Sequence, residues 1–355
     1  MRPGHRVGIA GLSLLSAIMA CSESFLPASA VTDLRAVAAL VAVEGKPGRA
    51  NPEPGDGVQV SLVVTDQGAP PSGESGVAAL TPPVLQWSFV ACIPQPTLIG
   101  PPICGIPIEP CDGCSEAPPA DPLAMPVMGF RTPSQKELED AQADTVLLQG
   151  ALCADGPPAR DAILRFIRGE TDDLAPCEDP AGEGRFVTVV VPIETTPDDP
   201  NLNPEISTVL FNGRPWPPPY DQGVPRTAPR TGCKADLDAF TDAERSAHPL
   251  AGSAPSTINL HVTPDSLQSY TVDDLDLVEE IQVSWLADGG AFERTFSFIT
   301  DPARSVLTQW QPFQEVPEEG MLVRFNFVIR DGRGGSDQLE RGLCVLPAPA
   351  GESPP

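Results

Sequence analysis

Residues 323–345 read VRFNFVIRDGRGGSDQLERGLCV, and this stretch decides the fold class. Apolar and polar residues alternate on both sides of a central turn, which is the period of a half-buried β-strand. The turn, Asp331-Gly332-Arg333-Gly334-Gly335, supplies glycines for the positive φ angles that a hairpin connection requires. The sequence therefore predicts a long β-hairpin. Its apolar residues are Val323, Phe325, Phe327, Ile329, Leu339, Leu343 and Val345.

The same period recurs along the chain. It predicts strands near residues 58–64, 84–92, 146–153, 185–192, 206–211, 281–285 and 296–298. Asn212-Gly213 follows one of them and is a strong two-residue hairpin signal. We expect Phe296 and Phe298 to continue the pattern of Ile281, Val283 and Trp285 on a paired strand.

One short helix is predicted near residues 132–141. Thr132 fits the N-cap position, Pro133 the first helical position and Gln135 the capping box. The chain also has 44 prolines and 31 glycines among 355 residues. Because proline breaks helix interiors, this composition favours strands and irregular loops over long helices.

The charge balance of the chain limits the classes of molecule that it is expected to bind. The formal net charge is −26, with 22 basic residues against 48 acidic ones. Nucleic acid is not expected as a partner, because phosphate contacts need clustered Lys and Arg. The acidity favours a soluble, monomeric surface protein.

The first twenty residues have the pattern of a secretory signal, with Arg2 and Arg6 before an uncharged stretch. The stretch is shorter than the roughly 20 apolar residues that cross a membrane. It ends at Ile18-Met19-Ala20-Cys21, which resembles the bacterial lipobox. The resemblance implies that Cys21 is lipidated and holds the chain at a membrane. Ser22 favours the outer membrane, at the cell surface or facing the periplasm. The alternative is an ordinary signal with Cys21 in a disulfide.

Eight further cysteines remain, and an even number in an exported chain predicts four disulfides. They are Cys92, Cys104, Cys111, Cys114, Cys153, Cys177, Cys233 and Cys344. Proximity favours Cys92 with Cys104 and Cys153 with Cys177, and it leaves Cys233 for Cys344. Cys111-Asp-Gly-Cys114 also has the spacing of a redox pair or half a zinc site, although a structural loop disulfide is the favoured interpretation.

Motifs of catalysis are sparse. The sequence contains no GxSxG, HExxH, phosphate loop or dinucleotide fingerprint, so no catalytic, cofactor-binding or metal-binding residue is predicted. Two weaker hypotheses stay open. The first is a calcium site, with candidate ligands Asp273, Asp274 and Asp276, or Asp331 with Asp337. The favoured interpretation is that these carboxylates are solvated turn residues. Trp216 and Tyr220 are either an exposed contact for a glycan or protein, or a loop anchor, which we favour.

The second half resembles a bacterial immunoglobulin-like domain of the PKD-like type. The resemblance is carried by Trp285 on a central strand and by the closing hairpin through Asp331-Gly332-Arg333-Gly334-Gly335. The first half, with Trp87 after Pro54-Gly55-Asp56, looks like a divergent copy. Together with the lipobox, this resembles uncharacterised Gram-negative lipoproteins. It implies an all-β chain of two tandem immunoglobulin-like sandwiches, a fold that many binding modules share.

The expected organisation has six parts. They are a signal peptide at 1–20, a lipidated Cys and tether at 21–45, a first sandwich with a Cys- and Pro-rich insertion at 46–195, a linker at 196–204, a second sandwich at 205–347 and a disordered tail at 348–355. A candidate first strand follows the tether, before about residue 46. The expected function is non-catalytic binding or scaffolding of an unknown protein or glycan. The alternatives are an exported enzyme or enzyme accessory with a site in the insertion, and a calcium-dependent adhesion module.

Overall fold

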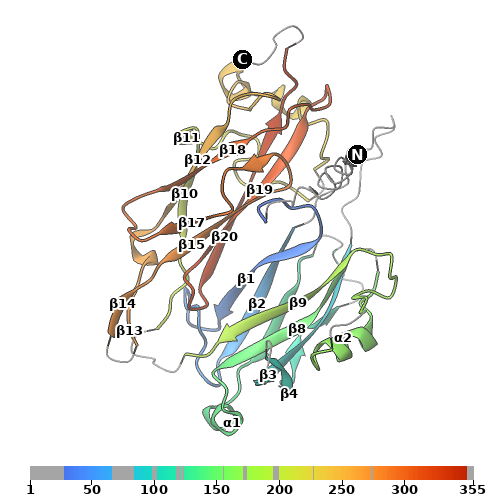
Figure 1. The fold of residues 1–355 in the computed structure, drawn as a ribbon, viewed down its shortest axis with the longest axis vertical. Helices are drawn as coiled ribbons and strands as arrows, with labels where there is room; N and C mark the ends of the chain where they lie inside the picture. The colour runs from blue at the N-terminus through green and yellow to red at the C-terminus, as the bar shows by residue number, and fades with distance from the viewer. Residues whose placement is uncertain are drawn as a thin grey trace, which may run out of the picture.

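The computed structural model describes residues 28–349, apart from 66–83, 98–101, 117–120, 122–123, 155, 171–173, 195–199, 227 and 273–274. The predicted signal peptide and Cys21 lie outside the described residues. The fold is all-β, and its named sheets are antiparallel. Figure 1 shows two stacked bodies, with the earlier part of the chain below and the later part above.

The lower body is built from two facing sheets. One has the order β1 (Arg35–Val43), β2 (Gly57–Thr65), β7 (Val127–Arg131) and β5 (Cys111–Asp112). The other has the order β4 (Ile103–Pro107), β3 (Leu85–Gln95), β8 (Thr145–Ala154) and β9 (Gly184–Pro192), with β6 (Ser115–Glu116) beside β3. Helices α1 (Gln135–Ala141) and α2 (Arg160–Phe166) flank β8 in the chain.

The upper body repeats this plan. One sheet has the order β11 (Arg214–Pro215), β10 (Ile206–Phe211), β12 (Ser256–Val262), β18 (Val306–Gln311) and β16 (Ala291–Phe292). The other has the order β17 (Phe296–Ile299), β15 (Ile281–Ala287), β19 (Met321–Arg330) and β20 (Ser336–Val345). A separate hairpin joins β13 (Ser269–Val272) to β14 (Leu275–Val278). The short helices are η1 (Ala235–Leu237), α3 (Asp242–Arg245) and η2 (Pro264–Ser266).

The shared strand order confirms the immunoglobulin-like sandwich. In each body the first and second main strands pair, the second pairs with the fifth, and the third, sixth and seventh form the facing sheet. Trp87 on β3 and Trp285 on β15 occupy the equivalent third strand, and both are buried. A buried Trp at this position packs between the two sheets of such sandwiches. Each body has its own large apolar core.

The long hairpin of the sequence analysis is confirmed. β19 and β20 pair from Met321 with Val345 to Arg330 with Ser336. The Asn212-Gly213 hairpin is confirmed too, because β10 and β11 pair across it and both turn residues have positive φ.

The candidate strand after the tether is confirmed, because residues 35–43 form β1 of the first sheet. The first sandwich therefore begins before residue 46, and the late boundary has a physical cause. β1 is buried on both faces, with Val41 in the lower core and Val37 against the upper body. A small-residue strand of this kind lacks the alternation by which strands are recognised.

The insertion is more ordered than predicted. Within residues 93–128, β4 pairs with β3, and β7 continues the first sheet beside β2. The predicted helix starts two residues later than expected, because Ser134 is the N-cap and Glu137 completes the capping box. Thr132 instead donates to the Glu53 carbonyl at 2.7 Å. β15 and β17 do pair, but Phe296 and Phe298 point to solvent while Ile299 faces the core.

Candidate functional site

Polar side chains join the two sandwiches at the junction between them. Strand β1 lies against β20 of the upper body (Figure 1). The hydroxyl of Ser336 donates to the Ala39 carbonyl at 2.7 Å, and the guanidinium of Arg330 donates to the Val37 carbonyl. Both bonds join side chains of the upper body to backbone oxygens of β1.

Apolar contacts reinforce this junction. Val37 and Ala38 of β1 pack with Leu286 and Val328 of the upper sheet. Val31 joins them, and its backbone N–H donates to the Ala287 carbonyl at 2.9 Å. The five side chains are each less than 8 % exposed. Their burial at roughly 25 cal/mol per Å² of apolar surface makes the junction a small hydrophobic core.

Asparagines complete the junction. Asn203 donates to the carbonyls of Val41 at 3.2 Å and Arg49 at 3.3 Å, and it accepts from the Ser336 N–H at 3.1 Å. Asn201 donates to Asp331 at 3.0 Å and is fully buried. Residues 200–204 lie between β9 and β10, and their short polar side chains bind both bodies. Their composition indicated a loop and gave no sign of these partners.

The turn of the long hairpin is held by a buried carboxylate. Asp331 accepts from the backbone N–H groups of Arg333, Gly334 and Gly335 at 2.7 to 3.1 Å. Burial raises its pKa above the usual aspartate range, against the lowering effect of these bonds. Arg333 pairs with the buried Glu279 at 2.9 Å and lies over the Tyr270 ring at 4.4 Å. The turn thus serves the junction structurally.

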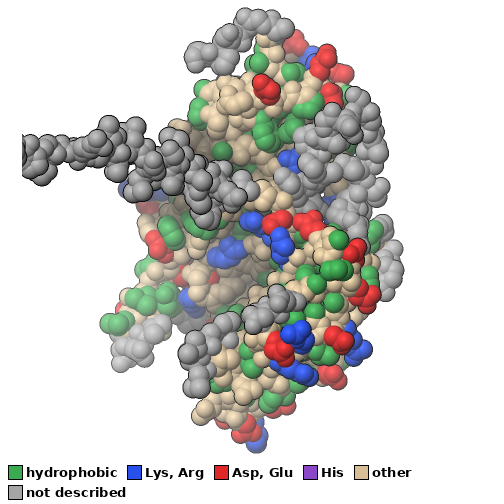
Figure 2. Space-filling model, turned by 45° about the vertical axis from the view of Figure 1, so that its right-hand side comes forward, with side chains coloured by type: hydrophobic (Ala, Val, Ile, Leu, Met, Phe, Trp, Pro, Cys, Tyr) green, Lys and Arg blue, Asp and Glu red, His purple; other side chains and the backbone are tan. Residues whose placement is uncertain are grey.

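A cavity of about 230 Å³ opens beside this junction. One wall comes from the lower body and the segment before it, and it is apolar except for Thr65, whose buried hydroxyl has no hydrogen-bond partner within the described residues. Its apolar residues are Val31, Leu62, Val63, Val64 and Met125. The opposite wall is polar and belongs to the upper body. It consists of Arg226, Asp288, Arg324, Asn326, Gln338 and Glu340. Figure 2 shows acidic and basic side chains gathered between the two halves of the molecule on this face.

The polar wall is set by the register of β19 and β20. Asn326 lies directly opposite Glu340, and Val328 opposite Gln338, so all four side chains share one face. Asp288 accepts from the Arg324 N–H at 2.8 Å and pairs with Arg230, and Arg324 donates to the carbonyls of Pro225 and Ala228. The charged residues of this wall are therefore already engaged by the protein. Burial also raises the pKa of Glu340, which nearby Arg324 lowers.

The four disulfides join the pairs that proximity favoured. They are Cys92–Cys104, Cys111–Cys114, Cys153–Cys177 and Cys233–Cys344. Cys114 is buried, and the adjacent Gly113 carbonyl accepts from the Trp87 indole at 2.8 Å. The Cys111–Cys114 loop therefore covers the central Trp of the lower body, which supports its interpretation as a structural disulfide.

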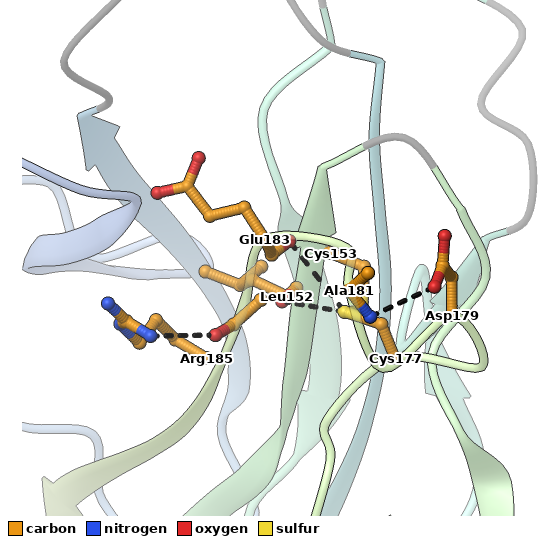
Figure 3. The surroundings of a disulfide bond; sticks show 8 residues. Leu152, Cys153, Cys177, Asp179, Ala181, Glu183 and Arg185 are labelled. Carbon is orange, nitrogen blue, oxygen red and sulfur yellow. Dashed lines mark hydrogen bonds between the residues drawn. A yellow bond between two sulfur atoms is a disulfide. The ribbon is translucent and has the colours of Figure 1, made fainter.

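The Cys153–Cys177 disulfide is buried and joins β8 to the segment before β9. The Cys177 sulfur is 3.7 Å from the Glu183 carbonyl (Figure 3). A side chain at Gly184 would clash with it, because a Cβ there lies 2.1 Å from Cys177 Sγ. Figure 3 shows Glu183 and Arg185 pointing away from the disulfide. Glu183 accepts from the Leu34 N–H and Arg185 pairs with Asp33, so this end of β9 is fastened to the start of β1.

The calcium candidates that the structure describes are each engaged in other contacts or exposed. Asp331 is occupied by backbone N–H groups, and Asp337 accepts from the N–H groups of Ile206 and Gln338, both at 2.8 Å. Asp276 is exposed on the β13–β14 hairpin and accepts from Thr271. Asp273 and Asp274 lie outside the described residues. No group of three or more His, Cys, Asp or Glu side chains in the described ranges is arranged to hold a metal ion.

The aromatic and histidine candidates have structural roles. Trp216 is buried, contacts Phe211, Phe325 and Phe327, and donates to the Gly342 carbonyl at 2.7 Å. Tyr220 is also buried and donates to Asp236. The loop-anchor interpretation is therefore confirmed.

Both ring nitrogens of the buried His248 are engaged by backbone groups. Nδ1 accepts from the Cys344 N–H at 3.1 Å, and Nε2 lies 2.8 Å from the Pro218 carbonyl. Burial lowers the pKa of this imidazole. His248 is thus held as a neutral ring that links the 218 loop to β20.

The cavity residues Asn326, Gln338 and Glu340 were not predicted from the sequence. One signal was present: Val328 is an apolar residue on the same strand face as the polar Arg324 and Asn326. An apolar residue on a polar face indicates that something covers it. Here the covering element is β1.

Comparison with known proteins adds no relationship. No protein-family model matches the chain, and no curated protein matches it significantly. Within the part of the chain that the structure describes, no helix is long and apolar enough to cross a membrane.

Proposed function

We propose that this chain is a lipoprotein that is anchored through Cys21 at the outer membrane and works as a non-catalytic binding arm. The proposal combines the lipobox-like sequence Ile18-Met19-Ala20-Cys21 with the two-sandwich ectodomain. The anchor would hold the arm at the cell surface or in the periplasm, and the unidentified partner would be a protein or a glycan.

One observation carries the binding role. The junction fixes the two sandwiches to each other through bonds from Ser336, Arg330 and Asn203 to the backbone of the lower body. Beside it lies a cavity whose polar wall includes the side-chain oxygen of Gln338, which is buried and has no hydrogen-bond donor among the described residues. A fixed junction with an unpaired acceptor in the cavity wall is suited to recognition, because a preorganised site loses little entropy on binding.

The enzyme alternative placed its site in the Cys-rich insertion. The described residues of the insertion pair with β3 and β7 and cover Trp87. Their contacts serve the lower sandwich, which favours a binding arm over a catalytic site in this segment.

The anchor is tested by cell fractionation. A Cys21→Ser variant is expected to leave the membrane fraction, while the neighbouring Ser22→Ala variant stays in it. Mass spectrometry of the wild-type amino-terminal peptide should show a diacylglyceryl group on Cys21. A Cys21→Ser protein that remains membrane-bound, or an unmodified Cys21, would refute the anchor.

A further inference from the structure

We infer that the cavity at the junction of the two sandwiches is a binding site for one neutral sugar residue, with Asn326 and Gln338 as its hydrogen-bonding groups. This inference rests on the proposed binding function and names the ligand class for it. Three properties of the cavity support it: its size, the charge of its walls and the hydrogen-bonding groups that the walls present.

Size limits the ligand. Sites for drug-sized molecules span roughly 300–1,000 Å³. The junction cavity, at about 230 Å³, lies below that range and is suited to a single ring with its substituents. A longer glycan would place only one residue inside.

Charge favours a neutral ligand. The polar wall carries two arginines and two carboxylates, so its formal charge is zero. Arg324 is engaged by the Pro225 and Ala228 carbonyls, and Asp288 by Arg324 and Arg230. An anionic or cationic ligand would compete with these pairs, whereas a neutral one leaves them in place.

Two amides face the cavity. Asn326 is only 7 % exposed and lines the polar wall. Gln338 lines the same cavity, and its buried Oε1 accepts from no donor within the described ranges. Leaving such groups unpaired in a protein interior costs free energy that a bound partner recovers.

The chemistry of these groups identifies hydroxyls as their partners. An amide side chain offers an acceptor oxygen and two donor hydrogens, and a hydroxyl both donates and accepts. Vicinal hydroxyls on a ring can therefore satisfy Asn326 and Gln338 together. Val31, Leu62, Val64 and Met125 form the opposite wall, against which the C–H face of a sugar ring packs.

The test uses the full-length protein purified in detergent and titrated with single neutral sugars: glucose, galactose, mannose and N-acetylglucosamine. Saturation-transfer NMR reports binding and calorimetry reports Kd. At least one of these sugars is expected to bind. Asn326→Leu and Gln338→Leu should each weaken that binding at least tenfold.

The matched control is Asn259→Leu. Asn259 also has a buried side-chain oxygen without a donor in the described part of the protein, but it lies on β12 and outside the cavity lining. This variant should keep the wild-type Kd. A third variant, Met125→Trp, fills the cavity from the apolar wall without changing either amide, and it should abolish binding while the protein remains folded by circular dichroism.

The inference is refuted if none of the four sugars binds, or if the cavity variants and Asn259→Leu bind equally well. It is also refuted if glucuronic acid, a free amino acid or a short peptide binds in this cavity more tightly than every neutral sugar. These outcomes are independent of the anchor, because the Cys21→Ser experiment measures location and not sugar binding. The anchor can therefore fail while the sugar site stands, and the sugar site can fail while the anchor stands.

Discussion

The hydroxyl of Ser336 donates a hydrogen bond of 2.7 Å to the carbonyl of Ala39, across 297 positions of the chain. Ser336 begins β20 of the upper sandwich, and Ala39 lies in β1 of the lower one. Because the acceptor is a backbone atom, the bond fixes the position of β20 relative to β1. The first strand of one sandwich thereby serves as a docking edge for the last strand of the other.

Asn203 should be the most sensitive polar residue of this junction. Asn203→Ala removes donors from the Val41 and Arg49 carbonyls and an acceptor from the Ser336 N–H. We expect the free energy of unfolding to fall by about 2 kcal/mol, since buried polar groups lose their partners. Urea denaturation measures this change. The control Asn259→Ala, whose side chain makes none of these junction bonds, should change stability by less than about 0.5 kcal/mol. Equal losses in the two variants would contradict the role of Asn203.

The disulfides should contribute differently to the free energy of unfolding, according to the length of the loop that each one closes. Cys233 and Cys344 are 111 positions apart, whereas Cys92 and Cys104 are 12 apart. In the chain-entropy account, removing the first pair as a double serine variant costs about 4 to 5 kcal/mol and removing the second about 3 kcal/mol. Guanidinium unfolding of both variants compares them. A larger loss for the Cys92 and Cys104 variant would show that local packing, and not loop closure, sets the contribution.

His248 should make stability depend on pH. Burial lowers the pKa of its imidazole below the ordinary 6.5, so the unfolded chain binds a proton more readily than the folded one. The resulting stability is fully present above about pH 6.5 and is lost as the pH falls toward the lowered pKa. The loss is about 1.4 kcal/mol for every pH unit that separates the folded and unfolded pKa values.

Unfolding free energies at pH 7.5, 6.5 and 5.5 measure the slope of stability against pH. His248→Asn places an amide oxygen where Nδ1 accepts from Cys344, and it does not titrate. We therefore expect a shallower slope in this variant. An unchanged slope would assign the pH dependence to other groups.

Trp216 should contribute to stability and not to ligand binding. It fills the space among Phe211, Phe325 and Phe327, so Trp216→Ala is expected to cost about 3 to 5 kcal/mol. Trp216→Phe keeps an aromatic ring but loses the indole hydrogen bond to the Gly342 carbonyl. This loss should lower the free energy of unfolding by about 1 kcal/mol beyond any change in packing. Thermal unfolding ranks the two variants. A Trp216→Phe variant of wild-type stability with weakened binding of the sugar would restore the exposed-contact interpretation.

Local sequence patterns predicted much of this architecture. Alternation located β2, β3, β15 and the β19–β20 hairpin, and cysteine spacing identified the four disulfides, because both signals depend on residues near each other in the chain. The bounds of β1 and its place in the first sandwich were missed because its two buried faces belong to different sandwiches. The junction cavity was missed for the same reason: Met125 and Asn326 meet only when two distant segments pack together.

The account depends most on the two sandwiches forming one rigid arm, and a distance across the junction tests this directly. Spin labels carried by non-canonical amino acids at Lys136 and Arg304, whose side chains are 82 % and 84 % exposed, leave the disulfides intact. Pulsed electron paramagnetic resonance should give one narrow distance distribution, which broadens in the Asn203→Ala variant. A broad distribution in the otherwise unmodified protein would show that the sandwiches move independently, and would contradict the account.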